Sequence, residues 1–419
     1  MQASPLRHGA GSRYPSRAPA ARPRAPPPKD RMQAAPPLRD ILATLVAFDT
    51  TSALTNLPLV DWVQAFAEGH GAAVERVVDA SGEKAALWIT VGPATVPGYV
   101  LSGHSDVVPV AGQAWSHDPF RLTEADGKLY GRGTSDMKGF LAVCLALLPE
   151  MAAAPLVRPI HLAISYDEEV GCLGVRPLIA RMREMGIAPL GCFVGEPTDM
   201  AVVTGHKGKY AARVTFTGKA CHSALAPSGV NAVEYAARFI LHVKQLADAC
   251  AASGARDPLY DVPHATGLSS VVHGGTALNI VPDRCTVDFE FRAIGSDDAG
   301  APARRAIAFA TDVLAAEMAA RDPACGVAVA PLIDYPGLEI AAESDLVTLA
   351  KRLAGRNGHA KVSFGTEGGL FQTLGGVPAV VIGPGSIARA HKADEFITAA
   401  ELDACAAFVR RLIADSRAG

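Results

Sequence analysis

The stretch Tyr99-Val100-Leu101-Ser102-Gly103-His104-Ser105-Asp106 decides how this chain is expected to fold. Apolar residues typical of a short buried strand lead directly into a histidine and an acid. The same pattern returns where residues 160–166 precede Glu168-Glu169 and where residues 192–194 precede Glu196. A fourth apolar run, residues 377–382, precedes the loop that carries His391. Because polar side chains beyond the carboxyl ends of parallel strands share one edge of a sheet, we expect these residues to meet.

Helical spacing separates the apolar runs, and the first helical pattern is formed by Leu38, Ile41, Leu42, Leu45 and Val46. Strands that alternate with helices are typical of an α/β layer with a largely parallel sheet. The length of 419 residues favours more than one domain. The sequence therefore predicts an α/β fold with a second domain.

The segment 210–325 differs from its surroundings. A helical pattern covers residues 230–249, and Val287, Phe289 and Phe291 alternate with polar residues as in a half-buried strand. Apart from His222, this block carries none of the candidate site residues. We expect an inserted α+β domain over residues 210–325, with the main domain formed by residues 32–209 and 326–419.

The first 31 residues are rich in arginine and proline and contain a single acid, Asp30. They lack the apolar segment of a secretory signal, and their prolines would interrupt the amphipathic helix of a transit peptide. We expect a disordered tail. A translation start at Met32 is an alternative interpretation of the same segment.

The composition disfavours several classes of protein. A net charge of -3 provides no basic surface for nucleic acid, and no apolar run approaches the roughly 20 residues of a membrane span. The eight cysteines are scattered without a C-x-x-C pair, and several lie in apolar runs. This usage predicts reduced, buried thiols in a cytoplasmic protein.

The candidate site combines carboxylates and imidazoles without a cysteine, which is a ligand set for a pair of divalent metal ions and predicts metal-assisted hydrolysis. His104 and Asp106, two residues apart, fit a metal ligand and the carboxylate that steadies its second ring nitrogen. Asp136, among the glycines of residues 131–139, fits a carboxylate that bridges two ions, with a helix cap as the alternative. In the adjacent pair Glu168-Glu169, one acid can bind metal while the other stays free as a general base.

These motifs resemble the co-catalytic zinc amidohydrolase family that includes acetylornithine deacetylase and succinyl-diaminopimelate desuccinylase. The resemblance runs from about Leu38 to the C-terminus and rests on residues 102–109, residues 131–139 and Gly195-Glu196-Pro197-Thr198. It implies a zinc-aminopeptidase-like three-layer catalytic domain with an inserted lid that also forms a homodimer. It also implies a cis peptide bond between Asp136 and Met137.

The resemblance implies a role for each site residue. One ion would be held by His104 and Glu196, the other by Glu169 and His391, and Asp136 would bridge them. Glu168 would be the general base, and Asp106 would support His104. Two Zn²⁺ ions are implied, with Co²⁺ as the alternative.

Four further residues match positions expected to contact substrate. His222 would reach the active site of the neighbouring subunit and stabilise the oxyanion, and Arg292 would bind a substrate carboxylate. Asn279 and Gly365 would contact substrate nearby. The residues themselves leave other interpretations open, because His222 also fits a surface loop and Arg292 also fits a partner of Asp288 or Glu290.

Within the family, the motifs at residues 205–208, 365–367 and 383–387 resemble those of acetylornithine deacetylase. The expected reaction is therefore hydrolysis of N2-acetylornithine to ornithine and acetate, a step of arginine synthesis. The alternative is another N-acyl amino acid, such as N-succinyl-diaminopimelate, or a small peptide. A non-catalytic relative that binds small molecules would be expected to lack Glu168 or a ligand, and none is missing.

Overall fold

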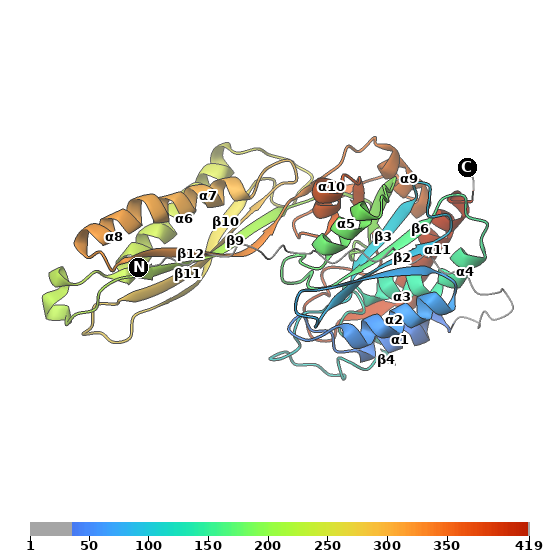
Figure 1. Ribbon diagram of the computed structural model, residues 1–419, viewed down its shortest axis with the longest axis horizontal. Coiled ribbons are helices and arrows are strands. Elements are labelled where there is room, and N and C mark those ends of the chain that lie inside the picture. Colours follow the sequence, from blue (N-terminus) through green and yellow to red (C-terminus); the bar gives the residue numbers. More distant parts are fainter. Residues whose placement is uncertain (1–35, 418–419) are drawn as a thin grey trace, which may run out of the picture.

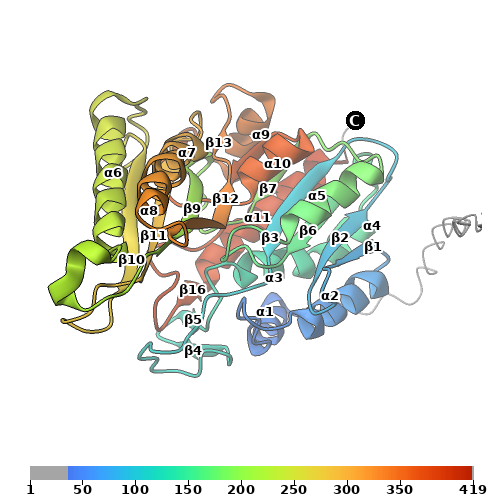
Figure 2. The same cartoon turned by 60° about the vertical axis from the view of Figure 1, so that its left-hand side comes forward.

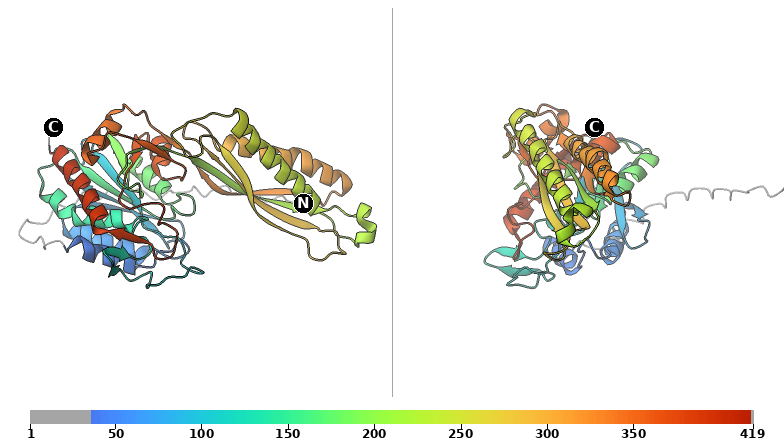
Figure 3. Two further views of the ribbon diagram at one scale, coloured as in Figure 1. Left: turned by 180° about the vertical axis from the view of Figure 1, so that it is seen from behind. Right: turned by 90° about the vertical axis from the view of Figure 1, so that its left-hand side faces the viewer.

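The protein is described by a computed structural model over residues 36–417, so the predicted tail at residues 1–31 lies outside the described residues. The chain forms two units that lie end to end and meet at a narrow junction (Figure 1, Figure 3). The larger unit holds both ends of the described chain, and the smaller one is inserted between them. The expected α/β fold with an inserted α+β domain is confirmed.

A mixed sheet of nine strands forms the centre of the larger unit within residues 36–417. Its order is β1-β2-β6-β3-β7-β15-β8-β13, and β14 also pairs with β8. The strands are β1 (Ala73–Val78), β2 (Ala85–Val91), β3 (Tyr99–His104), β6 (Ile160–Ser165), β7 (Gly191–Val194), β8 (Val203–His206), β13 (Leu338–Glu339), β14 (Ala360–Val362) and β15 (Ala379–Val381).

The four central strands, β6, β3, β7 and β15, are parallel to one another. Every residue of β3, β6, β7 and β15 is buried, which explains why these strands appear in the sequence as continuous apolar runs. Their carboxyl ends lie along one edge of the sheet. The chain segments that leave this edge carry His104, Glu168-Glu169, Glu196 and His391.

Helices cover both faces of this sheet and complete three layers (Figure 1). On one face α1, α2, α3, α4, α9 and α11 contribute to one hydrophobic core, and on the other face α5 and α10 contribute to a second. The helices are α1 (Leu38–Ala47), α2 (Leu57–Gly69), α3 (Lys138–Ala146), α4 (Leu148–Ala153), α5 (Val175–Glu184), α9 (Asp345–Ala354), α10 (Gly368–Gly375) and α11 (Ala399–Asp415).

A small antiparallel sheet, β16-β5-β4, lies beside the main sheet. It consists of β4 (Thr123–Ala125), β5 (Lys128–Tyr130) and β16 (Phe396–Thr398). Because β5 leads into the Asp136 loop and β16 directly follows the His391 loop, their pairing brings two site segments together.

The smaller unit, here called the lid, is an antiparallel sheet in the order β10-β11-β9-β12 with helices on one face (Figure 2). Its elements are β9 (Gly208–Thr217), η2 (Ser223–Ser228), α6 (Ala232–Ser253), β10 (Thr266–Gly274), β11 (Arg284–Ala293), α7 (Gly300–Ala308), the π-helical η3 (Phe309–Leu314), α8 (Ala315–Arg321) and β12 (Gly326–Tyr335). As the alternation predicted, Val287, Phe289 and Phe291 are buried in its core.

The lid extends past the boundary expected at residue 325. Strand β12, which spans 10 residues from Gly326 to Tyr335, pairs antiparallel with β9 and so belongs to the lid sheet. As an edge strand with one buried residue, β12 lacks the strong alternation that made β11 recognisable.

No helix within residues 36–417 is long and apolar enough to cross a membrane. All eight cysteines lie within residues 36–417 and are unpaired.

Candidate active site

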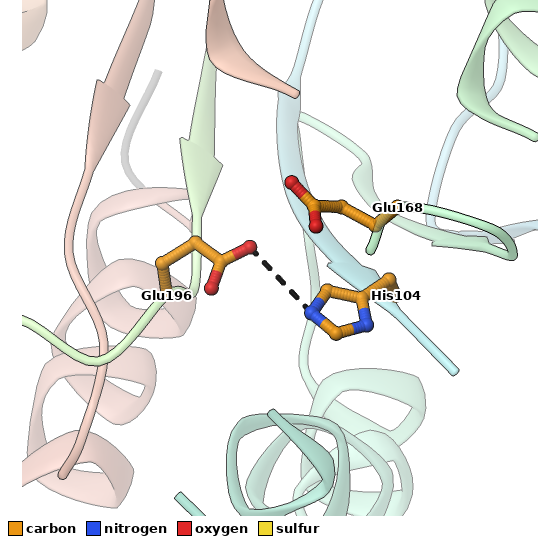
Figure 4. A group of neighbouring side chains, drawn as sticks. All are labelled: His104, Glu168 and Glu196. Atoms are coloured by element: carbon orange, nitrogen blue, oxygen red, sulfur yellow. Dashed lines mark ion pairs between the residues drawn. The ribbon is translucent and has the colours of Figure 1, made fainter. Parts of the chain in front are cut away.

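His104, the last residue of β3, is buried at the carboxyl edge of the sheet. Its Nε2 nitrogen lies 3.2 Å from Asp136 Oδ1 and 3.7 Å from Glu196 Oε1. Glu196 enters from the segment after β7, and Glu168 approaches from the segment after β6 (Figure 4). The residues that follow three adjacent parallel strands therefore meet at one point, as the sequence predicted.

His391 completes a second group on the other side of Asp136. Its Nε2 nitrogen lies 3.2 Å from Asp136 Oδ2 and 3.0 Å from Glu169 Oε2. Asp136 thus directs one carboxylate oxygen to each histidine. This is the arrangement expected of a carboxylate that bridges two ions.

The Asp136 loop is held in place by Glu395, a buried acid that lies just before β16. The Glu395 carboxylate accepts backbone N–H groups from Gly133 at 3.0 Å, Ser135 at 2.8 Å and Asp136 at 3.0 Å. It also accepts from Arg132 Nη1 at 2.7 Å. The peptide bond from Asp136 to Met137 is cis, as the resemblance implied.

Asp106 connects His104 with the loop that carries the paired glutamates. The His104 Nδ1 nitrogen is 2.9 Å from the Asp106 backbone oxygen and 3.4 Å from its Oδ1. The Asp106 carboxylate also accepts the backbone N–H groups of Glu168 at 3.1 Å and Glu169 at 3.3 Å. Asp106 therefore supports His104, as expected from the sequence, and it also holds the Glu168-Glu169 loop.

The carboxyl groups at the centre of the site are buried close together, so their ionised forms repel one another. Burial raises the pKa of Glu168, Glu169 and Glu196, and the nearby negative charge of Asp136 raises that of Glu169 and Glu196 further. Hydrogen bonds to Asp136 and Glu169 raise the pKa of His391 to about 10. Bound cations would relieve this concentration of negative charge.

The donor set fits divalent metal ions in two further respects. Glu196 Oε1 is buried and has no hydrogen-bond partner among the described residues. Two ligand atoms that share a tetrahedral zinc ion lie about 3.4 Å apart, given metal–ligand distances of about 2.0–2.2 Å. The separations of 3.0–3.7 Å between the histidine nitrogens and their carboxylate neighbours match that value. His104, Asp136 and Glu196 could hold one ion, and His391, Asp136 and Glu169 the other.

The structure does not bring the lid residues His222 and Asn279 to this cluster. Strand β9 leaves the junction at Gly208 and spans 10 residues, so the loop that follows Thr217 lies about 30 Å farther out. His222 forms a β-bridge with Ile280 there, and Asn279 accepts the backbone N–H of Ser223 at 2.9 Å. These two residues therefore lie together at the outer end of the lid.

Arg292 lies nearer the junction, with 31% of its side chain exposed. Its Nε nitrogen donates to Glu290 Oε1 at 2.9 Å, which is one of the pairings that the sequence left open. Gly365 packs against Tyr335, because a Cβ atom at position 365 would lie 2.2 Å from the tyrosine ring. Contact of Arg292, Asn279 and Gly365 with substrate remains a prediction.

Two residues near the site were not recognised from the sequence as parts of it. Glu395 lies in a charged loop that resembles a solvated surface segment, and three of the four hydrogen-bond partners of its carboxylate in the described chain are backbone N–H groups, which the sequence does not reveal. Tyr335, at the end of β12, is buried, and its burial raises its pKa.

Glu367, which precedes α10, is buried beneath the edge of the main sheet, where its carboxylate accepts from Ser102 Oγ at 3.1 Å and from Ser165 Oγ. Burial raises its pKa to about 7. Glu367 thus ties the start of α10 to the ends of β3 and β6.

Comparison with known proteins gives a consistent result. A family model described as peptidase family M20/M25/M40 matches residues 100–415. An acetylornithine deacetylase of Myxococcus xanthus is 35% identical over 385 residues, covering 90% of this chain and 97% of the relative. An acetylornithine deacetylase of Proteus mirabilis is 32% identical over 367 residues, covering 87% and 90%.

Solved structures share the fold. A tripeptidase from Staphylococcus aureus aligns with a TM-score of 0.72 at 21% identity, covering 92% of this chain and 100% of that one. An M20 family metallo-carboxypeptidase from Sulfolobus solfataricus aligns with a TM-score of 0.72 at 17% identity, covering 91% and 99%. A dinuclear metal-binding M20 peptidase from Bacillus subtilis aligns with a TM-score of 0.58 at 14% identity, covering 90% and 96%.

Replacement of Glu395 by glutamine is expected to weaken metal binding about 10- to 100-fold. In either orientation the amide NH₂ would face backbone N–H groups of the Asp136 loop, which would shift Asp136. The measurement is the Zn²⁺ dissociation constant, obtained by competition with a chromophoric chelator.

Glu401→Gln is the matched control, because Glu401 caps α11 and pairs with Arg389 without a hydrogen bond or ion pair to the Asp136 loop in the described chain. It should leave the Zn²⁺ dissociation constant unchanged. Wild-type affinity in Glu395→Gln would contradict the role given to Glu395.

Proposed function

Because the chain belongs to peptidase family M20/M25/M40 and is a metal-dependent hydrolase, we propose a specific reaction for it. This reaction is the hydrolysis of N2-acetylornithine to ornithine and acetate. The observation that carries the proposal is the arrangement around Asp136, with a histidine and a glutamate on each side and a further carboxylate, Glu168, beside them. Metal ligands with an adjacent general base are what metal-assisted amide hydrolysis requires.

The substrate is proposed from the relatives. Those from Myxococcus xanthus, Proteus mirabilis and Pasteurella multocida are all named acetylornithine deacetylase, at 35%, 32% and 30% identity. Each alignment covers at least 87% of this chain and at least 90% of the relative. This supports a place in arginine synthesis, in which the enzyme releases the amino acid from its acetyl group.

Zn²⁺ is the proposed metal and Co²⁺ the alternative, since both accept imidazole and carboxylate ligands. The proposed ligands are His104, Asp136 and Glu196 for one ion and His391, Asp136 and Glu169 for the other. When bound, the two ions supply Lewis acidity, which polarises an amide carbonyl and makes water more acidic.

Glu168 is the proposed general base. It takes a proton from the water that attacks the acetyl carbonyl and passes it to the amide nitrogen as the C–N bond breaks. One C–O bond forms and one C–N bond is lost, and the products are acetate and the free amine. The Glu168 carboxylate extends from its loop toward the space between His104 and Glu196, where such a water would react (Figure 4).

Arg292 is the proposed partner of the substrate carboxylate. Its Nε nitrogen is held by Glu290, and the guanidinium has further N–H groups on its other nitrogens, which suit a carboxylate. Its partial exposure at the base of the lid leaves it accessible to a small ligand.

A homodimer through the lid is proposed from the exposed edge of the lid sheet. The edge strand β10 exposes Leu268 by 48%, Val271 by 39% and Val272 by 49%, and Leu241 on the adjacent helix α6 is 63% exposed. Exposed apolar side chains and unpaired backbone groups of an edge strand favour pairing with a second copy. Such a dimer would let His222 reach the site of the partner subunit, because it lies far from the site of its own chain.

The cytoplasm is the proposed compartment. All eight cysteines are unpaired, and free thiols persist in reducing surroundings.

Turnover of N2-acetylornithine should exceed that of N-succinyl-diaminopimelate and of other N-acyl amino acids, and a chelator should abolish it. The measurement is release of acetate or succinate and of free amine by zinc-loaded protein across this panel. Chelator-sensitive turnover that favours another member of the panel would contradict the proposed substrate. Turnover that survives removal of metal would contradict the proposed mechanism.

The two adjacent glutamates should respond differently to the same change. Glu168→Gln should retain both ions and lose about 10²- to 10⁴-fold in kcat, because it removes the base. Glu169→Gln should lose metal, because it weakens a ligand. Metal content by mass spectrometry and kcat would be measured on the same samples; metal loss with an intact rate in Glu168→Gln would rule out the base assignment.

Removal of the His222 side chain should lower kcat about 10²- to 10³-fold with metal content unchanged. If His222 acts in the partner's site, mixing His222→Ala with Glu168→Gln should restore activity, because one site of each heterodimer then has both groups. Random exchange would recover about a quarter of wild-type activity from a homodimer with two sites. No recovery, despite subunit exchange shown by differently tagged chains, would contradict action across the dimer.

A further inference from the structure

Cys172 differs from the other cysteines in its contact with the proposed general base. Its side chain is fully buried, and its Sγ atom lies 3.3 Å from Glu168 Oε1. Within residues 36–417 no other group donates a hydrogen bond to the Glu168 carboxylate. In this part of the chain the thiol is therefore the one donor that hydrogen-bonds the Glu168 carboxylate.

The backbone between the two residues fixes this contact. The backbone oxygen of Glu168 accepts N–H groups from both Gly171 and Cys172, each at 2.9 Å. Cys172 has a φ of 54°, in the left-handed region that residues other than glycine rarely adopt. A residue keeps such a conformation only where the surrounding structure enforces it. The left-handed backbone at Cys172 is part of a tight turn that directs the thiol at Glu168.

The lid packs against the same turn from the other side. A Cβ atom at Gly171 would lie 3.5 Å from Ile333 of β12, and Arg176 donates to the Asp334 backbone oxygen of that strand. The turn is thus enclosed between the main sheet and the returning lid strand. This packing restricts the positions that the thiol can take.

A general base must keep a lone pair directed at the proton that it removes, and a free carboxylate can rotate away from that orientation. A thiol is a weak hydrogen-bond donor, so it can orient a carboxylate with little competition for the proton. We propose that Cys172 is a positioning residue that holds Glu168 Oε1 and leaves Oε2 directed at the reacting water. The proposal rests on the proposed function, in which Glu168 is the base.

Steady-state kinetics of two variants test this role. Cys172→Ala should lower kcat about tenfold, with KM and metal content unchanged, because the base is no longer oriented. Cys172→Ser should recover most of the loss, because a hydroxyl can donate to the same oxygen. Wild-type kcat in Cys172→Ala, or loss of metal in both variants, would overturn the proposal.

Cys405→Ala is the matched control. Cys405 is also fully buried but lies in α11, and its replacement should affect stability without lowering kcat. An equal loss of kcat in Cys405→Ala and Cys172→Ala would mean that any buried cavity has this effect, and would also overturn the proposal.

A second readout does not require turnover. The S–H stretching band of Cys172, identified in the infrared spectrum by its absence in Cys172→Ala, should move to higher frequency in Glu168→Ala, where the acceptor is lost. An unmoved band would overturn the contact itself. If the wild-type enzyme hydrolyses no N-acyl amino acid, the proposed function is refuted, and the kinetic role of Cys172 is refuted with it. The S–H band would still report on the contact between Cys172 and Glu168.

Discussion

The two oxygens of the Asp136 carboxylate face one histidine each, at 3.2 Å, and the rest of the site is arranged around this group. Glu196 and Glu169 lie on its two sides, so several carboxylates share a small buried volume. Such a cluster is unfavourable without cations, as the raised pKa values of Glu169 and Glu196 indicate. Its position is enforced by a network in which Glu395 holds the backbone around Asp136 and Asp106 holds the backbone of both glutamates on the loop after β6.

The fold explains why these groups can be held so closely. Four parallel strands, buried on both faces, end at the same edge of the sheet, and each is followed by a segment with at least one site residue. Rigid strands place the segments that carry the ligands, and hydrogen bonds within and between these segments fix them. The lid is attached at the same edge, and its returning strand contacts the turn that carries Glu168 and Cys172.

Much of this could be predicted from the sequence, because buried parallel strands appear as short apolar runs and their carboxyl ends are marked by acids and histidines. That reasoning located His104, Asp136, Glu168, Glu169, Glu196 and His391, which the structure brings together. It could not locate Glu395, which accepts mainly backbone N–H groups of a loop far away in the sequence. It could not connect Cys172 with Glu168 either, because that contact depends on a left-handed residue within a turn. The sequence also ends the lid too early, before β12, because an exposed edge strand has little hydrophobic pattern.

Anomalous X-ray diffraction from crystals of the zinc-loaded protein would show whether Asp136 joins two metal sites. We predict two anomalous peaks, one among His104, Glu196 and Asp136 and the other among Glu169, His391 and Asp136. A single peak in fully loaded protein, or two peaks of which one does not contact Asp136, would contradict it.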